Sequence, residues 1–194
     1  MALDQTNNII KLEEFTEYLG DEGSTVYGRY EAIINAVSHL FNTYTKRKLK
    51  SRSLTEYYDG NGKSEMYVDN YPIVSVSTNI GIYVDTSRSY STSTVVSSSN
   101  IIIDSEEGKI RLANTSFSAG AHSIKIVYTA GYSTTTMPED LKYAAKEMGR
   151  FYLNREGSNR VGIRSEGGEG GSVTYETDMP WSVKQVLDMY RKPD

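Results

Sequence analysis

The spacing of apolar residues changes twice along this chain of 194 residues, from helical to strand-like and back to helical. Over residues 24–48, apolar side chains recur at spacings of three, four and one, which predicts one long helix with an apolar face. Helical spacing returns after Pro138 and continues to about Arg155. Because helices and strands bury different sets of positions, the two changes predict helical parts that flank a β-part.

Two shorter helices are predicted near the ends of the chain. Leu12, Phe15 and Leu19 form the stripe of the first, and Gly20 is expected to end it. The last helix is predicted over residues 180–191. Its apolar side carries Val183, Val186, Leu187 and Tyr190, with Trp181 near its start.

Residues 52–130 contain short runs rich in Val, Ile, Thr and Tyr that are bounded by Gly, Asn, Asp or Ser. Such runs predict a small antiparallel β-module. The turn-forming sequence Asp-Gly-Asn-Gly at residues 59–62 separates two of them, residues 53–58 and 64–68, and predicts that these two strands form a hairpin. The Ser/Thr-rich residues 86–99 are expected to be an exposed excursion from the module.

The predicted fold is α+β, a helical bundle with an inserted small antiparallel β-domain, a Gly-rich C-terminal arm and a short terminal helix. We assign residues 1–51 and 131–156 to the bundle and residues 52–130 to the β-module. Residues 157–179 concentrate glycine without a sustained apolar period, so we predict an arm that is mobile in the isolated subunit. Residues 180–194 carry the terminal helix.

The composition argues against several kinds of chemistry. Cysteine is absent, which excludes disulfides, thiolate zinc sites and cysteine nucleophiles. His39 and His122 fall in different predicted modules, and the turn at residues 59–62 lacks the acidic ligands of a calcium loop. We therefore predict no cofactor, no metal and no enzymatic activity. A hydrolase that uses paired carboxylates stays open, because the chain has 25 acidic residues.

The net charge of −4 offers no general attraction to nucleic acid. The chain begins without the basic and apolar regions of a secretory signal, and it has no run of apolar residues long enough to cross a bilayer. These features predict a soluble protein that is not exported and does not bind a membrane.

Several local sequences, taken in order, resemble the head-tail connector family of tailed bacteriophages, also called adaptor or head-completion proteins. They are TEYYDG at residues 55–60 after the long helix, YPIVSV at 71–76, YTAGY at 128–132 leading to MPEDLKYAA at 137–145, and MPWSV at 179–183 continuing to LDMYR at 187–191. The resemblance spans most of the chain. The inserted β-module departs from the smallest, nearly all-helical members of the family.

This resemblance implies a structural subunit of a homo-oligomeric ring, commonly of twelve copies, that is made in the host cytoplasm and lies at the head-tail interface of the virion. The ring would dock on the portal protein and carry a stopper or tail-completion protein on its far side. It would extend the DNA channel, so that DNA passes through its lumen without sequence-specific binding. The ring would act by positioning its partners and not by catalysing a reaction.

Six residues are candidates for partner binding. Val173 and Tyr175 lie in a β-like stretch of the arm, which could add a strand to the exposed edge of a partner. The alternative is that the arm is only a linker. Trp181, Val183, Leu187 and Tyr190 lie in the terminal helix, which could contact the portal or the adjacent subunit, and a role in the subunit's own core is the alternative.

A different function is a ligand-binding or carbohydrate-binding β-domain of a virion or surface protein. In that case Tyr57, Tyr58, Tyr67 and Tyr71 would form one stacking surface. The flanking helices argue against this alternative.

Overall fold

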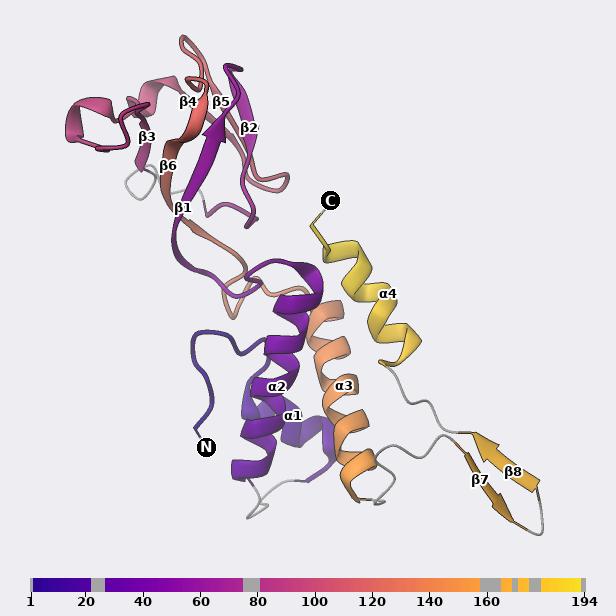
Figure 1. Cartoon of the computed structure of the whole chain (residues 1–194). Helices are drawn as coiled ribbons and strands as arrows, with labels where there is room; N and C mark the ends of the chain where they lie inside the picture. The colour runs from indigo at the N-terminus through magenta and orange to yellow at the C-terminus, as the bar shows by residue number, and fades with distance from the viewer. Residues whose placement is uncertain are drawn as a thin grey trace. The chain divides into compact units, whose positions relative to one another are not determined.

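The computed structural model describes residues 2–21, 27–74, 81–157, 165–168, 171–174 and 179–192. These residues form four α-helices, two three-stranded antiparallel sheets and a two-stranded hairpin (Figure 1). The chain divides into two compact units, which we call the helical unit (residues 1–46 and 134–194) and the β unit (residues 47–133). The predicted α+β fold with a short terminal helix is confirmed.

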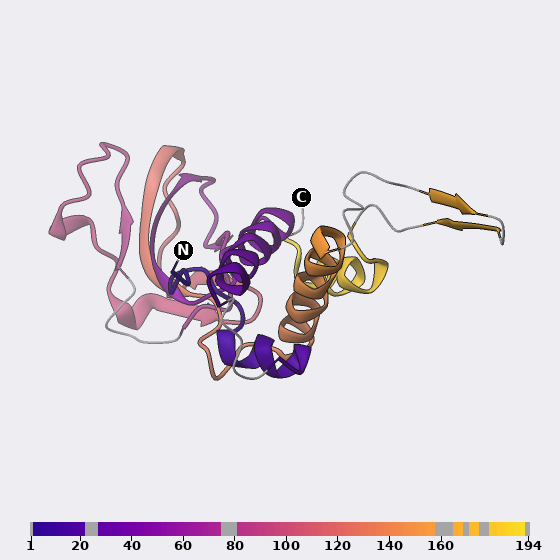
Figure 2. The same ribbon diagram turned by 90° about the horizontal axis from the view of Figure 1, so that it is seen from below.

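The helical unit contains α1 (Leu12–Leu19), α2 (Tyr27–Thr45), α3 (Glu139–Gly157) and α4 (Trp181–Tyr190). The helices α2 and α3 pack against each other, and α1 contacts both (Figure 2). The terminal helix α4 also contacts both α2 and α3. The two long helices predicted on either side of the β-module therefore associate, as the predicted bundle requires.

Local signals define the ends of the helices. Gly20 takes the left-handed conformation that ends α1, with a φ of 69°, as predicted. Lys46 has a φ of 57° directly after α2, so the long helix ends before the predicted residue 48. Residues 24–26 of that prediction lie outside the described residues. Glu139 and Asp140 occupy the first turn of α3, where acidic side chains favour the helix dipole.

The predicted apolar stripes build the core of the helical unit. A Cβ atom on Gly149 would lie 2.7 Å from two ring atoms of Phe15, so a glycine at this position of α3 allows α1 to pack closely. The ring of Phe15 meets that of Tyr30 edge to face, with centroids 5.8 Å apart. The buried apolar residues of the four helices include Phe15, Ile33, Ile34, Val37, Phe41, Leu141, Ala144, Ala145, Met148, Val183 and Leu187.

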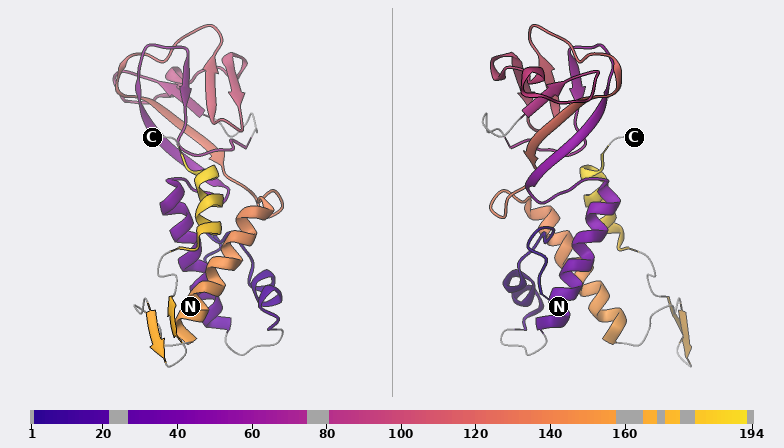
Figure 3. Two further views of the ribbon diagram at one scale, coloured as in Figure 1. Left: turned by 90° about the vertical axis from the view of Figure 1, so that its right-hand side faces the viewer. Right: turned by 60° about the vertical axis from the view of Figure 1, so that its left-hand side comes forward.

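The β unit contains two antiparallel sheets (Figure 3). One has the order β1 (Arg52–Gly60), β6 (Gly120–Ala130), β3 (Gly81–Val84), and the other has the order β2 (Glu65–Tyr67), β5 (Lys109–Leu112), β4 (Ile101–Asp104). Two short 3-10 helices, η1 (Thr92–Thr94) and η2 (Ser98–Asn100), lie in the largely exposed excursion. The two sheets share one core, made of Val68, Ile73, Ile82, Ile110, Leu112, Phe117, Ile124, Ile126, Tyr128 and Ala130.

The predicted hairpin across residues 59–62 is wrong. Strand β1 pairs with β6, and β2 pairs with β5 in the other sheet, so the turn leads from one sheet to the other. The physical reason is length. Strand β2 has only three residues, whereas β6 has eleven and gives the nine-residue β1 a much longer ladder. This pairing joins residues about 70 positions apart, for example Leu54 with Tyr128, and local sequence cannot specify it.

The two chain segments that lead into and out of the β unit are bonded to each other. The N–H of Tyr132 donates to the carbonyl of Leu49 at 2.8 Å, and the N–H of Ser51 donates to the carbonyl of Tyr132 at 2.9 Å. Gly131 has a φ of 100°, and a Cβ atom there would lie 2.8 Å from the Leu49 carbonyl oxygen. Glycine is therefore required where the two segments meet.

Strands β7 (Ser165–Gly168) and β8 (Gly171–Thr174) form an antiparallel hairpin within the predicted Gly-rich arm. Val173 lies in β8, opposite Glu166. Tyr175 and the rest of the predicted partner strand, residues 175–177, lie outside the described residues. That residues 157–179 act as a separate arm stays a prediction.

Candidate assembly surfaces

The inner face of α4 is fixed to the helical unit. Val183 and Leu187 are four residues apart, so they lie on one face of α4, and both are fully buried. The hydroxyl of Tyr190 donates to both carboxylate oxygens of Asp140, at 2.8 and 2.9 Å. At the other end of α4 the hydroxyl of Ser182 donates to Glu147 at 2.7 Å. These contacts place α4 antiparallel to α3.

A second tyrosine ties α4 to α2. The hydroxyl of Tyr44 donates to Asp188 at 2.6 Å, and this bond raises the pKa of the Tyr44 hydroxyl above its usual value. Both tyrosine–aspartate pairs lie at the surface of the unit. The helix is thus held by two buried apolar side chains and a rim of exposed hydrogen bonds.

The outer face of α4 carries large exposed side chains. Trp181 is 67% exposed and Met189 is 70% exposed, and their separation of eight residues places them on the same side of the helix, about 80° apart. The four candidate residues in the terminal helix therefore differ in how far they are buried. Val183 and Leu187 lie in the core, Trp181 is exposed, and Tyr190 is half-buried. Sequence reasoning missed Met189, although its spacing from Trp181 was the available signal.

The predicted stacking surface of four tyrosines is not formed. Tyr57 is exposed on β1, but Tyr58 points to the opposite side of that strand and is half-buried against the core. Tyr67 lies on β2 in the other sheet, near Lys109. Tyr71 packs under the guanidinium of Arg47, whose central carbon lies 3.4 Å from the ring centroid. The prediction failed because adjacent strand residues face opposite sides.

A different aromatic row crosses the outer face of the first sheet. Tyr57, Lys125 and Tyr83 are direct partners across β1, β6 and β3. The Lys125 ammonium lies 5.0 Å from the ring centroid of Tyr83 and 5.6 Å from that of Tyr90. The rings of Tyr57 and Tyr90 are 5.5 Å apart. We call these four residues the aromatic row.

The turn after β3 positions Tyr90 for this row. The Asp85 carboxylate accepts hydrogen bonds from the hydroxyls of Ser87 (2.6 Å) and Ser89 (2.7 Å) and from the backbone N–H groups of Ser87, Ser89 and Tyr90. These bonds, those from Ser87 first, hold the pKa of Asp85 well below its usual value.

A second carboxylate organises the interior of the β unit. Glu56 accepts hydrogen bonds from the hydroxyls of Tyr58 and Tyr128 and from the Asn70 amide, the last at 2.6 Å. The two hydroxyls in turn accept backbone N–H groups of Asp69 and Asn70, at 2.8 and 3.3 Å. Burial, followed by the contact with Glu56, raises the pKa of both tyrosines. We call this the Glu56 network.

The Glu56 network explains why separated sequence motifs occur together. TEYYDG contributes Glu56 and Tyr58, and YTAGY contributes Tyr128. The YPIVSV motif begins at Tyr71, directly after Asn70. Two segments that carry the family resemblance thus meet at Glu56, and the third begins directly after Asn70, so the network fixes the strands and the loop of residues 69–71.

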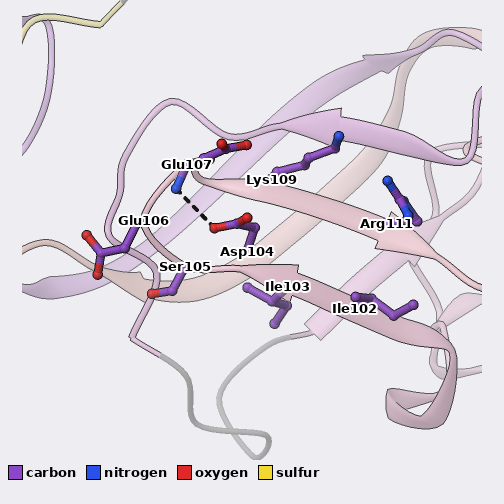
Figure 4. Close-up of a pocket in the computed structure, with 8 residues that line it drawn as sticks. All are labelled: Ile102, Ile103, Asp104, Ser105, Glu106, Glu107, Lys109 and Arg111. Carbon is purple, nitrogen blue, oxygen red and sulfur yellow. Dashed lines mark hydrogen bonds between the residues drawn. The ribbon is translucent and has the colours of Figure 1, made fainter.

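A shallow hollow on the β4–β5 hairpin mixes both charges (Figure 4). Its cations are already paired, because Glu65 lies 3.1 Å from the Lys109 ammonium and 3.4 Å from the Arg111 guanidinium. The Glu107 N–H donates to Asp104 at 3.4 Å, as the dashed line in Figure 4 marks. The hollow contains neither histidine. Within the described ranges, no group of three or more His, Asp or Glu side chains is placed to hold a metal ion.

None of the helices in the described part of the chain is long and apolar enough to span a bilayer. The chain thus has a helical unit with an inserted β unit, and its terminal helix exposes large side chains. Residues 8–193 match the family described as head completion protein, so the chain belongs to this family. The predictions of a phage head-tail connector protein and of its place in the virion at the head-tail interface are confirmed.

Solved structures share the fold over the whole chain. A chain in the neck of an empty gene transfer agent particle, computed with C6 symmetry, has a TM-score of 0.65 at 15% identity, and the match covers 100% of this chain and 95% of that one. A chain of the native gene transfer agent virion has a TM-score of 0.62 at 17% identity, and the match covers 100% of this chain and 94% of that one. A chain in the neck of the native particle, computed with C12 symmetry, has a TM-score of 0.58 at 17% identity, and the match covers 100% of this chain and 93% of that one. No curated protein sequence matches the chain.

Proposed function

We propose that this chain forms a closed ring of twelve copies that docks on the portal protein and presents its far side to a stopper or tail-completion protein. The observation that carries this proposal is the whole-chain fold match to neck proteins of particles computed with C6 and C12 symmetry. A closed ring of twelve identical copies has a twelvefold axis, which is also a sixfold axis, so it agrees with both symmetries. Membership in the head completion family supports the same position between head and tail.

The proposed work of the ring is mechanical. It extends the DNA channel and supplies the surface on which the tail assembles. The net charge of −4 suits a channel through which DNA passes without sequence-specific binding, because a negative wall does not retain the phosphate backbone. The chain needs no catalytic step for this role.

The terminal helix is the proposed contact with the portal or the adjacent subunit. Its outer face offers Trp181, a residue type enriched among the side chains that dominate binding energy at interfaces. Tyr190 lies on the opposite side of the helix from Trp181, where it bonds to Asp140 and, with Val183 and Leu187, holds the helix in place. The arm, with Val173 and Tyr175, is proposed to add a strand to the edge of a neighbouring protein.

The test is electron microscopy of the purified chain, alone and mixed with the portal protein of the same phage. We expect closed rings that stack on the portal. Trp181→Ser is expected to weaken portal binding while circular dichroism stays unchanged, and Tyr57→Ser, which removes an exposed aromatic side chain from the β unit, serves as the matched control. A chain that stays monomeric and ignores the portal would contradict the proposal.

One observation favours a second candidate function, the binding of a carbohydrate or similar ligand by the β unit. The aromatic row exposes tyrosine rings beside a lysine, and sugar rings stack on such faces. Glycan-array binding that is lost in Tyr57→Ala would support it. Absence of binding by the wild-type chain would rule it out.

A further inference from the structure

Two hollows of opposite charge flank α1 in the helical unit. The first lies against α1, α2 and the N-terminal segment and is lined by the carboxylates of Glu13, Glu14, Glu17 and Glu31, together with Lys11 and the apolar Leu3 and Leu12. Glu14 is engaged, because it accepts the Lys11 N–H at 2.8 Å and lies 3.8 Å from the Lys142 ammonium. The other three carboxylates form no ion pair with any residue that the structure describes. We call this the acidic hollow.

The second hollow lies on the other flank of α1, against α2 and α3. It is lined by Arg29 and Arg150, by Asp21, and by the half-buried apolar groups of Tyr18, Leu19 and Leu153. Asp21 accepts a hydrogen bond from the Tyr30 hydroxyl. We call this the basic hollow.

The two arginines of the basic hollow have unused donor capacity. Arg29 donates through Nε and Nη2 to Glu156 at 3.1 and 2.9 Å, but a guanidinium carries five N–H donors. Arg150 forms no ion pair within the described part of the chain. Both arginine side chains are exposed, so a carboxylate from outside the subunit can reach them.

Helix geometry keeps the two hollows apart. Arg29 and Glu31 are two residues apart on α2, which directs their side chains about 200° apart around the helix axis. On α1, Glu13 and Glu17 lie on one flank because they are four residues apart, while Tyr18 lies on the other. The helical unit therefore presents an acidic side and a basic side.

We propose that the acidic hollow of one copy of this chain receives the arginines of the basic hollow of the next copy. The inference rests on the proposed function, because it names the two faces through which the subunits of the ring meet. A ring closes only when each subunit carries two different, complementary faces. The hollows meet this requirement, since carboxylates outnumber cations in one and arginines outnumber carboxylates in the other, and each adds half-buried apolar side chains that contact can cover.

The experiment exchanges the two charges in the full chain. Glu17→Arg and Arg150→Glu are made singly and together, and native mass spectrometry measures the fraction of chain in rings. Each single variant places like charges at every interface, so we expect the interface to weaken about tenfold or more and rings to disappear at concentrations where wild type assembles. The double variant restores opposite charges, and we expect rings to return.

A mixture of the two single variants gives a sharper result. If the two copies alternate around an even-numbered ring, every interface has either the natural or the exchanged pair of charges. We therefore expect the equimolar mixture to form rings with equal numbers of the two variants, although neither variant assembles alone. Glu106→Arg makes the same charge change on the β unit and is expected to leave assembly unchanged.

The outcomes separate this inference from the proposed function. Wild-type rings with single variants that assemble equally well would overturn the pairing of the hollows and leave the ring proposal intact. Folded single variants that are rescued neither by mixing nor by the double exchange would also overturn it. A wild-type chain that forms no ring, alone or on the portal, would overturn both.

Discussion

The hydrogen bonds that hold α4 in the helical unit differ in their position from those that join the strands of the β unit. In the helical unit, the hydrogen bonds that hold α4, such as Tyr190 to Asp140 and Tyr44 to Asp188, lie at the surface over an apolar core. In the β unit, Glu56 and its tyrosines form a network inside the fold. Surface bonds can be exchanged for contacts with a partner, whereas an internal network fixes a shape. The contacts of α4 can therefore adapt to a partner, whereas the Glu56 network gives the β unit a fixed form.

The largest expected effect tests whether the two units are separate at all. Phe117→Ala removes a fully buried ring from the β core, and Phe41→Ala does the same in the helical core. Each is expected to cost about 3–5 kcal/mol of unfolding free energy. Hydrogen exchange with mass spectrometry should show faster exchange confined to the unit that carries the change. Equal loss in both units would show that they unfold as one body and would break the comparison.

The next effect concerns the attachment of α4. Leu187→Ala leaves a cavity beneath the helix and is expected to cost about 2–5 kcal/mol, measured as faster amide exchange in residues 181–190. Tyr190→Phe removes one exposed hydrogen bond and is expected to cost about 0.5–1.5 kcal/mol. If Tyr190→Phe were the more damaging change, the surface bonds and not the apolar anchors would hold α4.

The network inside the β unit gives an intermediate effect. Tyr128→Phe removes a donor to Glu56 and the acceptor of the Asn70 N–H, so two partners lose a bond and the expected cost is about 1–3 kcal/mol. Tyr57→Phe makes the same chemical change at an exposed site and is expected to stay within about 0.5 kcal/mol of wild type. Similar results in urea unfolding for the two variants would mean that the network adds no rigidity.

These two units also differ in how much of them the sequence predicted. The helices followed from contacts three and four residues apart, and Phe15, Ile33, Phe41 and Leu141 all lie in the core as their spacing indicated. The strands predicted at residues 53–58 and 64–68 correspond to β1 and β2 within one or two residues at each end. The pairing partners of the strands were not all predicted. Strand β1 pairs with a strand about 70 residues away, whereas the spacing of apolar residues reports only on local structure.

The assembly surfaces were predicted less well than the fold. Helical spacing already separated Val183 and Leu187 from Trp181, so their different burial could have been predicted. The Glu56 network could not have been predicted, because it joins three segments through side chains that come together only when the sheet pairs. The two charged hollows were also missed, because each combines side chains from segments that only the packing of the helices brings together.

The smallest expected effect is a local one with pH. Because the folded chain holds the pKa of Asp85 below the unfolded value, this carboxylate stabilises its turn above the unfolded pKa, and the contribution is lost as the pH falls through that value, about 4, toward the folded pKa. We expect NMR signals of residues 86–90 to stay unchanged as the pH falls through about 4 and to shift only well below it, because the folded carboxylate keeps its charge there. In Asp85→Asn the shift at low pH is expected to disappear. A wild-type turn whose signals titrate near pH 4 would mean that its hydrogen bonds do not hold Asp85 and that Asp85 does not organise the position of Tyr90.

A cryo-electron microscopy reconstruction of the neck of the intact particle, made without imposed symmetry, would show whether this chain is a ring subunit between head and tail. We expect twelve copies in a closed ring between the portal and the tail, with the outer face of α4 in contact and the acidic hollow of each copy against the basic hollow of the next. A neck that lacks this chain, or that holds it as isolated copies with α4 in solvent, would show that the chain is not a ring subunit.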